Sequence, residues 1–552
     1  MKVTVSGPKL SKRVLEIEKD TRAEDILALV KDEMPHPIYL CTLDNCYRAL
    51  THVVYHDCTI EFHDIRTQIA WVAYQNSLML LFIKAIHDVL GKRTQVSVKN
   101  SLNKGLYIRI SKNISDNDLS IIDQRMRELV EQDLPIKKEY ISKTRAITLA
   151  STLKQKETYN LLKTLPSLEN VEIYSLDDEQ QIFYSLMIPS TGYLKYFELR
   201  RYQKGFLLRY PHQSEPEKIP EYKDDVLLYN GFKQSSSWGK LMNVNYISDL
   251  NKKILDDKMN DLYLLQEALH EKRIAEIADM ITKENKRLVL ICGPSSSGKT
   301  TFANRLCIQL QVNGKSTLCM GTDDYFVERE QTPLDKNGEK DYESIKAVDT
   351  DLFISNMEDL LAGKTVDLPT FDFIEGTKRY GLKKTKIDED AIIVVEGIHA
   401  LNQILTNGIP DTEKFKIYIS PFSPTCIDRH NRIPFTDARM IRRLVRDYQF
   451  RGRSAKVTIN DWPKVRAGED ENIFPFLNEA DVFFNSNCIY EFAVLKKYAE
   501  PLLNQITREE KEYAEAQRIL SYLRFIGSVN DDSKINQNSI IREFIGGSSI
   551  VK

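Results

Sequence analysis

The chain contains 552 residues, too many for one hydrophobic core, because single domains usually hold roughly 100–200 residues. Hydrophobic residues make up 42% of the sequence and charged residues 28%, a balance that excludes a disordered or fibrous protein. The formal net charge of −2 excludes bulk attraction to nucleic acid or an anionic membrane, so either partner would need a local basic patch.

Neither a membrane span nor a secretory leader is predicted. No apolar run approaches the roughly 18 residues that a transmembrane helix needs. The first residues, MKVTVSGPKLSKRVLEIEKD, lack the apolar stretch of a signal peptide. The eight cysteines form no C-x-x-C pair, and Cys41 and Cys46 are spaced too widely for a zinc knuckle. We expect a reducing, cytoplasmic setting and no membrane partner.

Residues 1–65 alternate short apolar strands with turns and contain one helical stretch, Ala23 to Lys31, with Thr21 as its N-cap. This pattern predicts a small α+β module. Helical periodicity then predicts helices at 68–90, 115–132 and 143–162, with strands near 171–211. A long charged helix at 251–286 connects to a region of alternating β- and α-type segments, which predicts a parallel sheet with crossover helices.

The strongest motif is GPSSSGKT at 293–300, which satisfies G-x-x-x-x-G-K-[ST] in full. An apolar run, Leu288 to Cys292, precedes it and a helical pattern follows, as a phosphate-binding loop requires. Backbone N–H groups of such a loop wrap the β-phosphate, and the helix N-terminus adds its positive end. Lys299 is expected at the β- and γ-phosphates and the Thr300 hydroxyl at Mg²⁺. The predicted ATP-binding residues are Gly293, Pro294, Ser295, Ser296, Ser297, Gly298, Lys299, Thr300 and Thr301.

Two later strands lead into acidic residues. The strand at 316–320 leads to Asp323 and Asp324. A carboxylate at this end of a parallel strand faces the ligand crevice, where it could accept the proton of an attacking hydroxyl. An Asp pair that only caps a turn is the alternative. The strand at 391–395 ends in Glu396, which is typical of a Walker-B acid that helps to hold Mg²⁺.

A basic segment follows, with eight arginines between Arg429 and Arg453. Arginine with few matching acids indicates a phosphate clamp or lid, and a salt-bridged surface helix is the alternative. Arg439 and Arg442 lie three residues apart, so on a helix their guanidinium groups can point the same way.

Five stretches, GPSSSGKTT, TDDYF, LPTFDF, VVEGIHAL and NRIPFTDARMIRRLVRDYQFRGRS, resemble in order and spacing the motifs of the uridine kinase and phosphoribulokinase family. The resemblance is nearest to the uridine-kinase-like branch in which the kinase follows a tRNA-synthetase-like half. It implies a nucleoside kinase that uses ATP and Mg²⁺, with Asp323 as general base. It also implies that Glu396 and Thr300 hold Mg²⁺. Lid residues Arg439 and Arg442 would stabilise the transferred phosphoryl group.

The acceptor side departs from that family. Uridine kinases carry an Asp in an F-D-H-P stretch that grips the ribose hydroxyls, and here Glu343 stands in its place. Phe371 opens the F-D-F run at 371–373 and is expected at the substrate together with Arg439. Gly376 stands where the family places a base-contacting His. The resemblance therefore implies intact phosphoryl chemistry, and it leaves open the identity of the nucleobase and even of the nucleoside.

Residues 1–65 resemble the TGS module of threonyl-tRNA synthetases. Residues 66–240 resemble the editing-type second domain of those enzymes, most clearly in PSTGYLKYFEL at 189–199. That domain is expected to use two His residues, a Cys and a further His. These positions are occupied here by residues that cannot serve as equivalent metal ligands, namely Tyr74, Leu78, Phe183 and Met187. We expect neither zinc nor aminoacyl-ester hydrolysis in this half.

The predicted architecture is multidomain, with α+β N-terminal modules followed by an α/β P-loop kinase domain around a parallel sheet. The expected parts are residues 1–65, 66–240, a helical connector 241–286, the kinase domain 287–505 and a helical extension 506–552. The expected reaction transfers the γ-phosphoryl group of ATP to the 5′-hydroxyl of a nucleoside, uridine or cytidine, in a homo-oligomer. A kinase for another polyol or modified nucleoside and a nucleotide-switched regulator that binds RNA or ribosomes are the alternatives.

Overall fold

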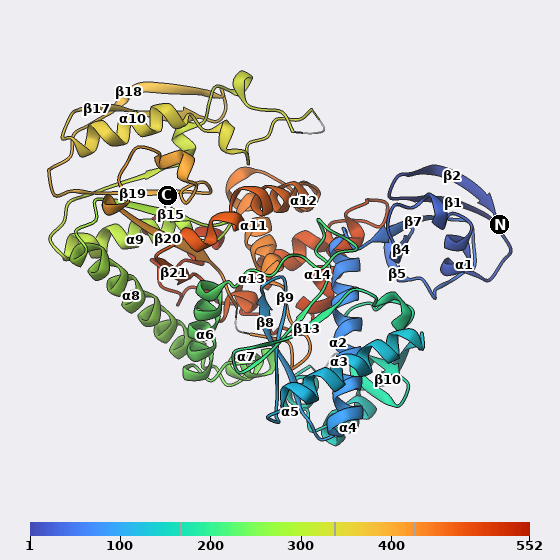
Figure 1. Ribbon diagram of the computed structural model, residues 1–552. Helices are drawn as coiled ribbons and strands as arrows, with labels where there is room; N and C mark the ends of the chain where they lie inside the picture. The colour runs from blue at the N-terminus through green and yellow to red at the C-terminus, as the bar shows by residue number, and fades with distance from the viewer. Residues whose placement is uncertain (166–167, 336–337, 424, 552) are drawn as a thin grey trace.

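The computed structural model describes residues 1–165, 168–335, 338–423 and 425–551. Figure 1 shows a small sheet module at the N-terminus, a middle region built around helix α2, and a C-terminal lobe around strands β15 to β21. The chain is thus multidomain and mixes α and β elements, as the sequence predicts.

The N-terminal module is a five-stranded sheet in the order β2-β1-β7-β4-β5. Helix α1 (Ala23–Ala28) is shorter than predicted, and Thr21 lies in a strand and is not its N-cap. The first helical N–H groups instead donate to the backbone carbonyl groups of His52 and Leu50. The strands of the sheet are β1 (Lys2–Gly7), β2 (Leu10–Glu16), β4 (Ile38–Leu43), β5 (Cys46–Ala49) and β7 (Cys58–Asp64).

Helix α2 (Gln68–Leu90) is the centre of the middle region. By length and composition it could cross a membrane, but 83% of its most apolar 18-residue window is buried inside the protein. A helix that is apolar on all sides and enclosed by protein is a core helix. Around it lie α3 (Asp116–Glu131) and two sheets, which contain β8 (Val96–Leu102), β9 (Gly105–Ile110), β10 (Ile136–Ser142), β11 (Asn170–Leu176), β12 (Glu179–Ile182), β13 (Glu198–Tyr202) and β14 (Gly205–Arg209).

The four positions that would carry editing ligands lie in one apolar core. Tyr74 and Leu78 of α2 and Phe183 and Met187 are all buried in it. The Tyr74 hydroxyl donates to the Tyr196 carbonyl oxygen at 2.7 Å. These side chains fill space and stabilise the fold of this region.

The sheet of the C-terminal lobe is parallel, in the order β16-β19-β15-β20-β21. Alternate residues of the central strand β15 (Leu288–Cys292) face opposite sides. Val289 and Ile291 pack in one core with α9 (Lys299–Val312), and Leu288 and Leu290 in another with α10 (Thr350–Leu361). The other strands are β16 (Thr317–Gly321), β19 (Ile392–Gly397), β20 (Lys414–Ser420) and β21 (Val482–Asn485). Their carboxyl ends meet at one edge, where ligands of such sheets bind.

Helices and one hairpin complete this lobe. The core that contains α9 also includes residues from Ile506 to Ile545, so the predicted extension packs as part of the lobe. The added elements are the hairpin β17 (Val366–Asp372) and β18 (Thr377–Thr385), and helices α8 (Met259–Lys283), α11 (Phe435–Arg451), α12 (Ala455–Asn472), α13 (Glu491–Asn504), α14 (Tyr513–Leu523) and α15 (Arg542–Ile545).

The segment that leads into α11 is held by the middle region. The Asn431 side-chain amide donates to the Ile182 carbonyl oxygen at 3.0 Å, and the Tyr184 N–H donates to Asn431 Oδ1 at 3.3 Å. Arg429 forms an ion pair with Glu157 at 2.5 Å. The N-terminal half therefore fixes the start of the arginine-rich helix.

Candidate active site

The loop between β15 and α9 has the backbone of a phosphate-binding loop. Ser296 and Gly298 have left-handed φ values of 60° and 83°, a conformation in which successive N–H groups form an anion-binding concavity. A Cβ on Gly293 would lie 2.3 Å from the Ile419 carbonyl oxygen, so glycine is required there. The Lys299 ammonium donates to the carbonyl oxygens of Gly293 and Pro294 at 2.9 and 3.2 Å. These two carbonyl groups are its hydrogen-bond partners among the described residues.

Thr300 and Glu396 meet where the neighbouring strands β15 and β19 end. The Thr300 hydroxyl donates to Glu396 Oε1 at 2.9 Å. Burial raises the pKa of Glu396 to about 7, and the Lys299 charge opposes part of that shift. Mg²⁺ prefers oxygen ligands and commonly combines one or two protein groups with substrate phosphates. The two oxygen donors beside the loop fit that ion.

Asp323 and Asp324 lie in one 3-10 turn, Thr322–Tyr325, directly after β16. Asp324 binds the hairpin of β17 and β18. Its carboxylate accepts hydrogen bonds from the Phe371 N–H at 3.2 Å and from Lys383 Nζ at 2.9 Å. Its carboxylate therefore holds β17 and β18 beside the turn.

Asp323 has different surroundings. Its carboxylate makes no hydrogen bond within the described part of the chain, and the residue is exposed to solvent. Desolvation by the surrounding protein raises the pKa of Asp323, and the charges of Lys299 and Arg451 oppose the shift. A free carboxylate near the loop lysine is what a general base needs.

Aromatic rings line the neighbouring surface. The Phe326 ring lies 6.1 Å from the Tyr342 ring, 5.7 Å from that of Phe371 and 6.3 Å from that of Phe373. Tyr342 and Phe373 are 42% and 60% exposed. Exposed rings that form one wall suit a flat, partly apolar ligand.

Glu343 follows Tyr342 and packs on α12, since a Cβ on Gly468 would lie 2.6 Å from Glu343 Cβ. Burial raises the pKa of Glu343 to about 7, Glu469 adds to the shift, and Arg443 and Lys299 oppose it. The structure thus brings Glu343 into the same electrostatic environment as the loop lysine.

Arg329 is a residue that the sequence analysis missed. It lies against Gly376, where a Cβ would meet Arg329 Nε at 2.6 Å. The Arg329 guanidinium donates to the Phe373 carbonyl oxygen at 2.5 Å. The space expected for a base-contacting His, at Gly376, is therefore filled by a side chain from a distant part of the sequence, and no local pattern signals this.

The structure places Arg439 and Arg442, the predicted lid residues, in the interior of the C-terminal lobe. Both side chains are fully buried. Arg439 forms a bidentate pair with Glu469 of α12 at 2.5 and 2.6 Å. Arg442 pairs with Glu491 of α13 and donates to the Ser486 carbonyl oxygen at 2.9 Å. Both guanidinium groups form ion pairs with carboxylates of other helices, so neither is available to bind a phosphoryl group.

The next arginines on α11 lie closer to the loop. Arg443 donates to Ser295 Oγ at 2.8 Å. Arg446 donates to Asp447 at 2.8 Å, and its charge opposes part of the rise in the pKa of Asp323. Spacing alone could not separate these arginines from the buried pair, because the face that each presents depends on the packing of α12 and α13.

Arg442→Ala is expected to lower the free energy of unfolding by about 3–5 kcal/mol, because Glu491 would stay buried without its partner. Thermal or chemical denaturation measures this. Arg443→Ala is the matched variant on the same helix; it should lose less stability and more kcat. An unchanged melting temperature in Arg442→Ala would contradict the buried-pair assignment.

Comparison with known proteins places the similarity in this lobe. Residues 288–490 match the model of the phosphoribulokinase / uridine kinase family. A uridine kinase of Staphylococcus epidermidis (strain ATCC 35984) is 32% identical over 197 residues, which cover 35% of this chain and 85% of that protein. A uridine kinase of Staphylococcus aureus (strain JH9) is 33% identical over 196 residues, with the same shares covered.

Among solved structures, one described as a possible uridine kinase from Bacillus stearothermophilus aligns with 39% of this chain and 98% of its own chain. The identity is 20% and the TM-score is 0.27. A score this low carries no argument, so the fold assignment rests on the strand order and the loop geometry described above.

Proposed function

Because the chain belongs to the phosphoribulokinase / uridine kinase family and is an ATP-dependent kinase, we propose that it phosphorylates the 5′-hydroxyl of a nucleoside, uridine or cytidine. The observation that carries the proposal is the Asp323 carboxylate. This carboxylate makes no hydrogen bond among the described residues, and the charge of Lys299 acts on its pKa. In the sequence, Asp323 precedes Phe326 of the aromatic wall by three positions. A base placed between phosphate site and ring site suits a hydroxyl acceptor that carries a flat ring.

In the proposed reaction Asp323 accepts the proton of the 5′-hydroxyl while that oxygen bonds to the γ-phosphorus of ATP. The bond from the γ-phosphorus to the bridging oxygen breaks, and ADP leaves. Lys299 and Arg443 balance the charge on the transferred group. Thr300 and Glu396 would hold Mg²⁺, which supplies charge neutralisation at the β- and γ-phosphates when bound.

A panel of nucleosides assayed with ATP and Mg²⁺ tests the proposal. Uridine or cytidine should give the highest kcat/KM, measured as ADP release and confirmed by detection of the nucleoside monophosphate. The matched control is 5′-deoxyuridine, which keeps the base and lacks the acceptor hydroxyl. If no nucleoside reacts faster than this control, the nucleoside assignment is wrong.

The raised pKa of Glu343 predicts a pH-dependent KM for the acceptor. A carboxylate with a pKa of about 7 is ionised at pH 8 and mostly protonated at pH 6. The ionised form accepts hydrogen bonds from ribose hydroxyls better, so KM should rise as pH falls through 7, by on the order of tenfold by pH 6. Glu343→Gln should show a flat KM over this range, and a wild-type KM that falls with acidity would contradict the role.

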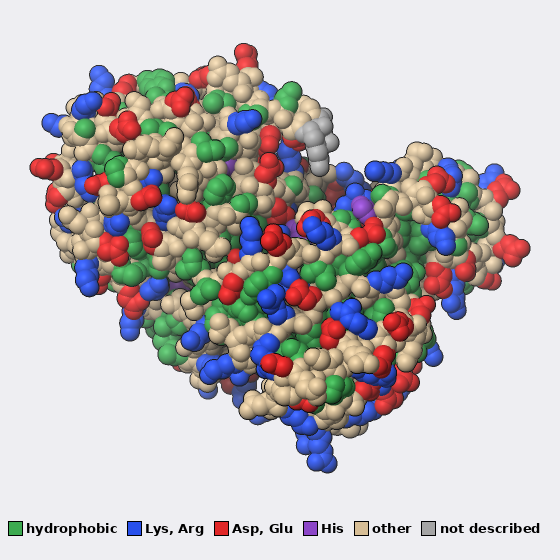
Figure 2. All heavy atoms as spheres, viewed as in Figure 1, with side chains coloured by type: hydrophobic (Ala, Val, Ile, Leu, Met, Phe, Trp, Pro, Cys, Tyr) green, Lys and Arg blue, Asp and Glu red, His purple; other side chains and the backbone are tan. Residues whose placement is uncertain are grey.

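Of the two alternative functions, the first has specific support and the second has observations against it. Glu343 and Gly376 depart from the uridine kinase pattern, which favours a modified nucleoside or another polyol as acceptor. The second alternative is a nucleotide-switched protein that binds RNA. Figure 2 shows Lys and Arg interspersed with Asp and Glu over the visible face, without the broad basic surface that RNA binding favours. A free base at Asp323 also has no use in a pure switch.

For the N-terminal half we propose TGS-like (1–65) and editing-type-like (66–240) parts that hold no zinc and support the kinase lobe. Two observations support this role: the core packing of Tyr74, Leu78, Phe183 and Met187, and the contacts that hold Asn431 ahead of α11. A cytoplasmic homo-oligomer remains part of the proposal.

A further inference from the structure

The segment 535–551, which contains α15, lies against the start of α9. The Thr301 N–H and the Thr301 hydroxyl both donate to one oxygen of Glu543, at 3.1 and 2.7 Å. Thr301 is fully buried under this contact. In Figure 1 the red end of the chain accordingly returns to the sheet that carries the phosphate-binding loop.

The position of this carboxylate matters because of what the start of α9 does. The first N–H groups of a helix have no partner within the helix. In α9 the intrahelical ladder begins with the Phe302 N–H, which donates to the Gly298 carbonyl oxygen at 3.1 Å. The Thr301 N–H is thus one of the unpaired donors that, in a phosphate-binding loop, face the α- and β-phosphates. Glu543 places an anionic group where a phosphate oxygen would bind.

Apolar packing holds the segment in this position. Ile540, Ile541 and Phe544 are fully buried. A Cβ on Gly298 would lie 2.5 Å from Ile540 Cγ2, so the segment touches the loop backbone itself. The Arg442 guanidinium lies 5.0 Å from the centre of the Phe544 ring. Three buried apolar side chains make the segment a fixed wall and leave the Glu543 side chain as the part that can turn away.

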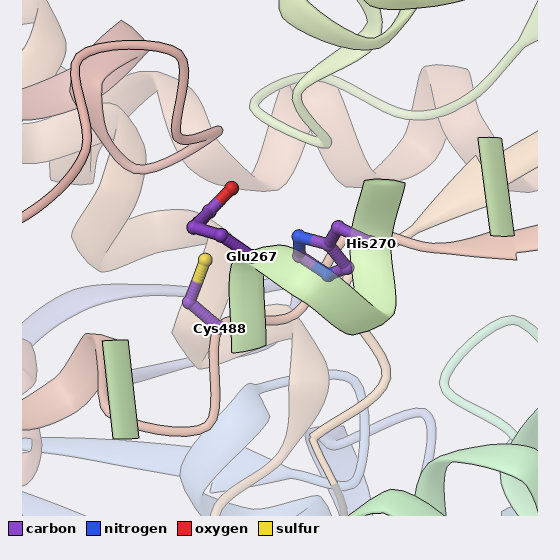
Figure 3. A group of neighbouring side chains, drawn as sticks. All are labelled: Glu267, His270 and Cys488. Carbon is purple, nitrogen blue, oxygen red and sulfur yellow. The ribbon is translucent and has the colours of Figure 1, made fainter. Parts of the chain in front are cut away.

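Polar contacts from α8 and α9 hold the same segment. The Ser539 hydroxyl donates to Glu267 at 2.6 Å, and Arg305 donates to Glu267 at 3.0 Å and to the Asn538 carbonyl oxygen at 3.2 Å. Figure 3 shows the Glu267 side chain beside the Cys488 thiol, with the His270 ring on the next turn of α8.

These three side chains could be taken for a metal site. However, both oxygens of Glu267 already accept hydrogen bonds. Burial and the nearby charges of Arg305 and Arg442 lower the pKa of His270 to about 3, and the same charges oppose a cation. Glu267 instead anchors the 535–551 segment through the Ser539 hydroxyl.

We propose that Glu543 is an intramolecular competitor of ATP. Its carboxylate occupies the Thr301 donors in the nucleotide-free protein and leaves them when the phosphates of ATP bind, while the segment stays in place. This inference rests on the proposed function of the loop as the ATP site. It makes the affinity for ATP weaker than the loop alone would give, so that turnover depends on the ATP concentration.

Calorimetric titration of the full chain with ATP and Mg²⁺, without an acceptor, tests the inference. Glu543→Gln removes the charge, and Glu543→Asp keeps the charge but shortens its reach. If the carboxylate competes by occupying Thr301, both variants should bind ATP about tenfold or more tightly, the gain expected from releasing one charge-assisted hydrogen bond. Glu509→Gln, an exposed change on the loop before α14, should leave the Kd unchanged.

An unchanged Kd in both Glu543 variants would overturn the inference. Tighter binding in Glu543→Gln alone would also overturn it, because general repulsion would then explain the effect without occupancy. Thermal melting without nucleotide verifies that each variant is folded. If the variants tighten ATP binding but no nucleoside is phosphorylated, the acceptor assignment fails and this inference stands. If nucleosides are phosphorylated and all Kd values agree, this inference alone fails.

Discussion

Lys299→Ala is expected to abolish phosphoryl transfer, with a loss of kcat/KM on the order of 10³-fold or more, the range seen when a cation at the γ-phosphate is removed. The Lys299 ammonium now rests on the carbonyl oxygens of Gly293 and Pro294 at 2.9 and 3.2 Å. Among the described residues, no carboxylate is hydrogen-bonded to the ammonium group, so Lys299 can turn to a phosphate without breaking an ion pair. The loop itself supplies no other charged side chain.

Steady-state kinetics of Lys299→Ala with ATP and uridine measure this loss. Lys364→Ala is the matched control, because that side chain is 66% exposed and forms a surface pair with Asp359. The control should behave like the wild type within about twofold, since surface pairs contribute little. Near-normal turnover in Lys299→Ala would mean that the loop is not the catalytic phosphate site.

Asp323→Asn is expected to lower kcat by on the order of 10²–10⁴-fold, the range of general-base catalysis, with little change in ATP affinity. The substitution keeps the shape of the side chain and removes its ability to accept a proton. Asp323 is suited to this role because its carboxylate is unengaged among the described residues and lies near Lys299.

Asp324→Asn is the comparison that makes the test specific. Asp324 binds the Phe371 N–H and Lys383 of the hairpin, so its loss should loosen β17 and β18 and cost less than about tenfold in kcat. If Asp324→Asn is inactive and Asp323→Asn turns over normally, the assignment of the base is displaced by one residue.

The parts of the site that lie close together in the sequence could be predicted from it. The run from Leu288 to Thr301 specifies strand, loop and helix through an apolar stretch, two glycines and a lysine, all within a short span. The placement of Asp323 and Glu396 at one edge follows from parallel strands, whose carboxyl ends coincide.

The parts that depend on distant packing could not be predicted. Arg439 and Arg442 have the spacing of a clamp, but Glu469 and Glu491, 30 and 49 residues away, decide that they are buried. The contact between Thr301 and Glu543 spans 242 residues and has no periodic signal. Helical periodicity likewise identifies α2 without showing that the rest of the middle region encloses it.

The proposed reaction moves the γ-phosphoryl group of ATP directly to a nucleoside. The most direct measurement incubates the full chain with γ-radiolabelled ATP, Mg²⁺ and uridine and then separates the products. Label is expected in uridine 5′-monophosphate, in an amount equal to the ADP formed, and that product should be lost in Asp323→Asn. Label found in inorganic phosphate alone, with uridine or cytidine left unmodified, would contradict it.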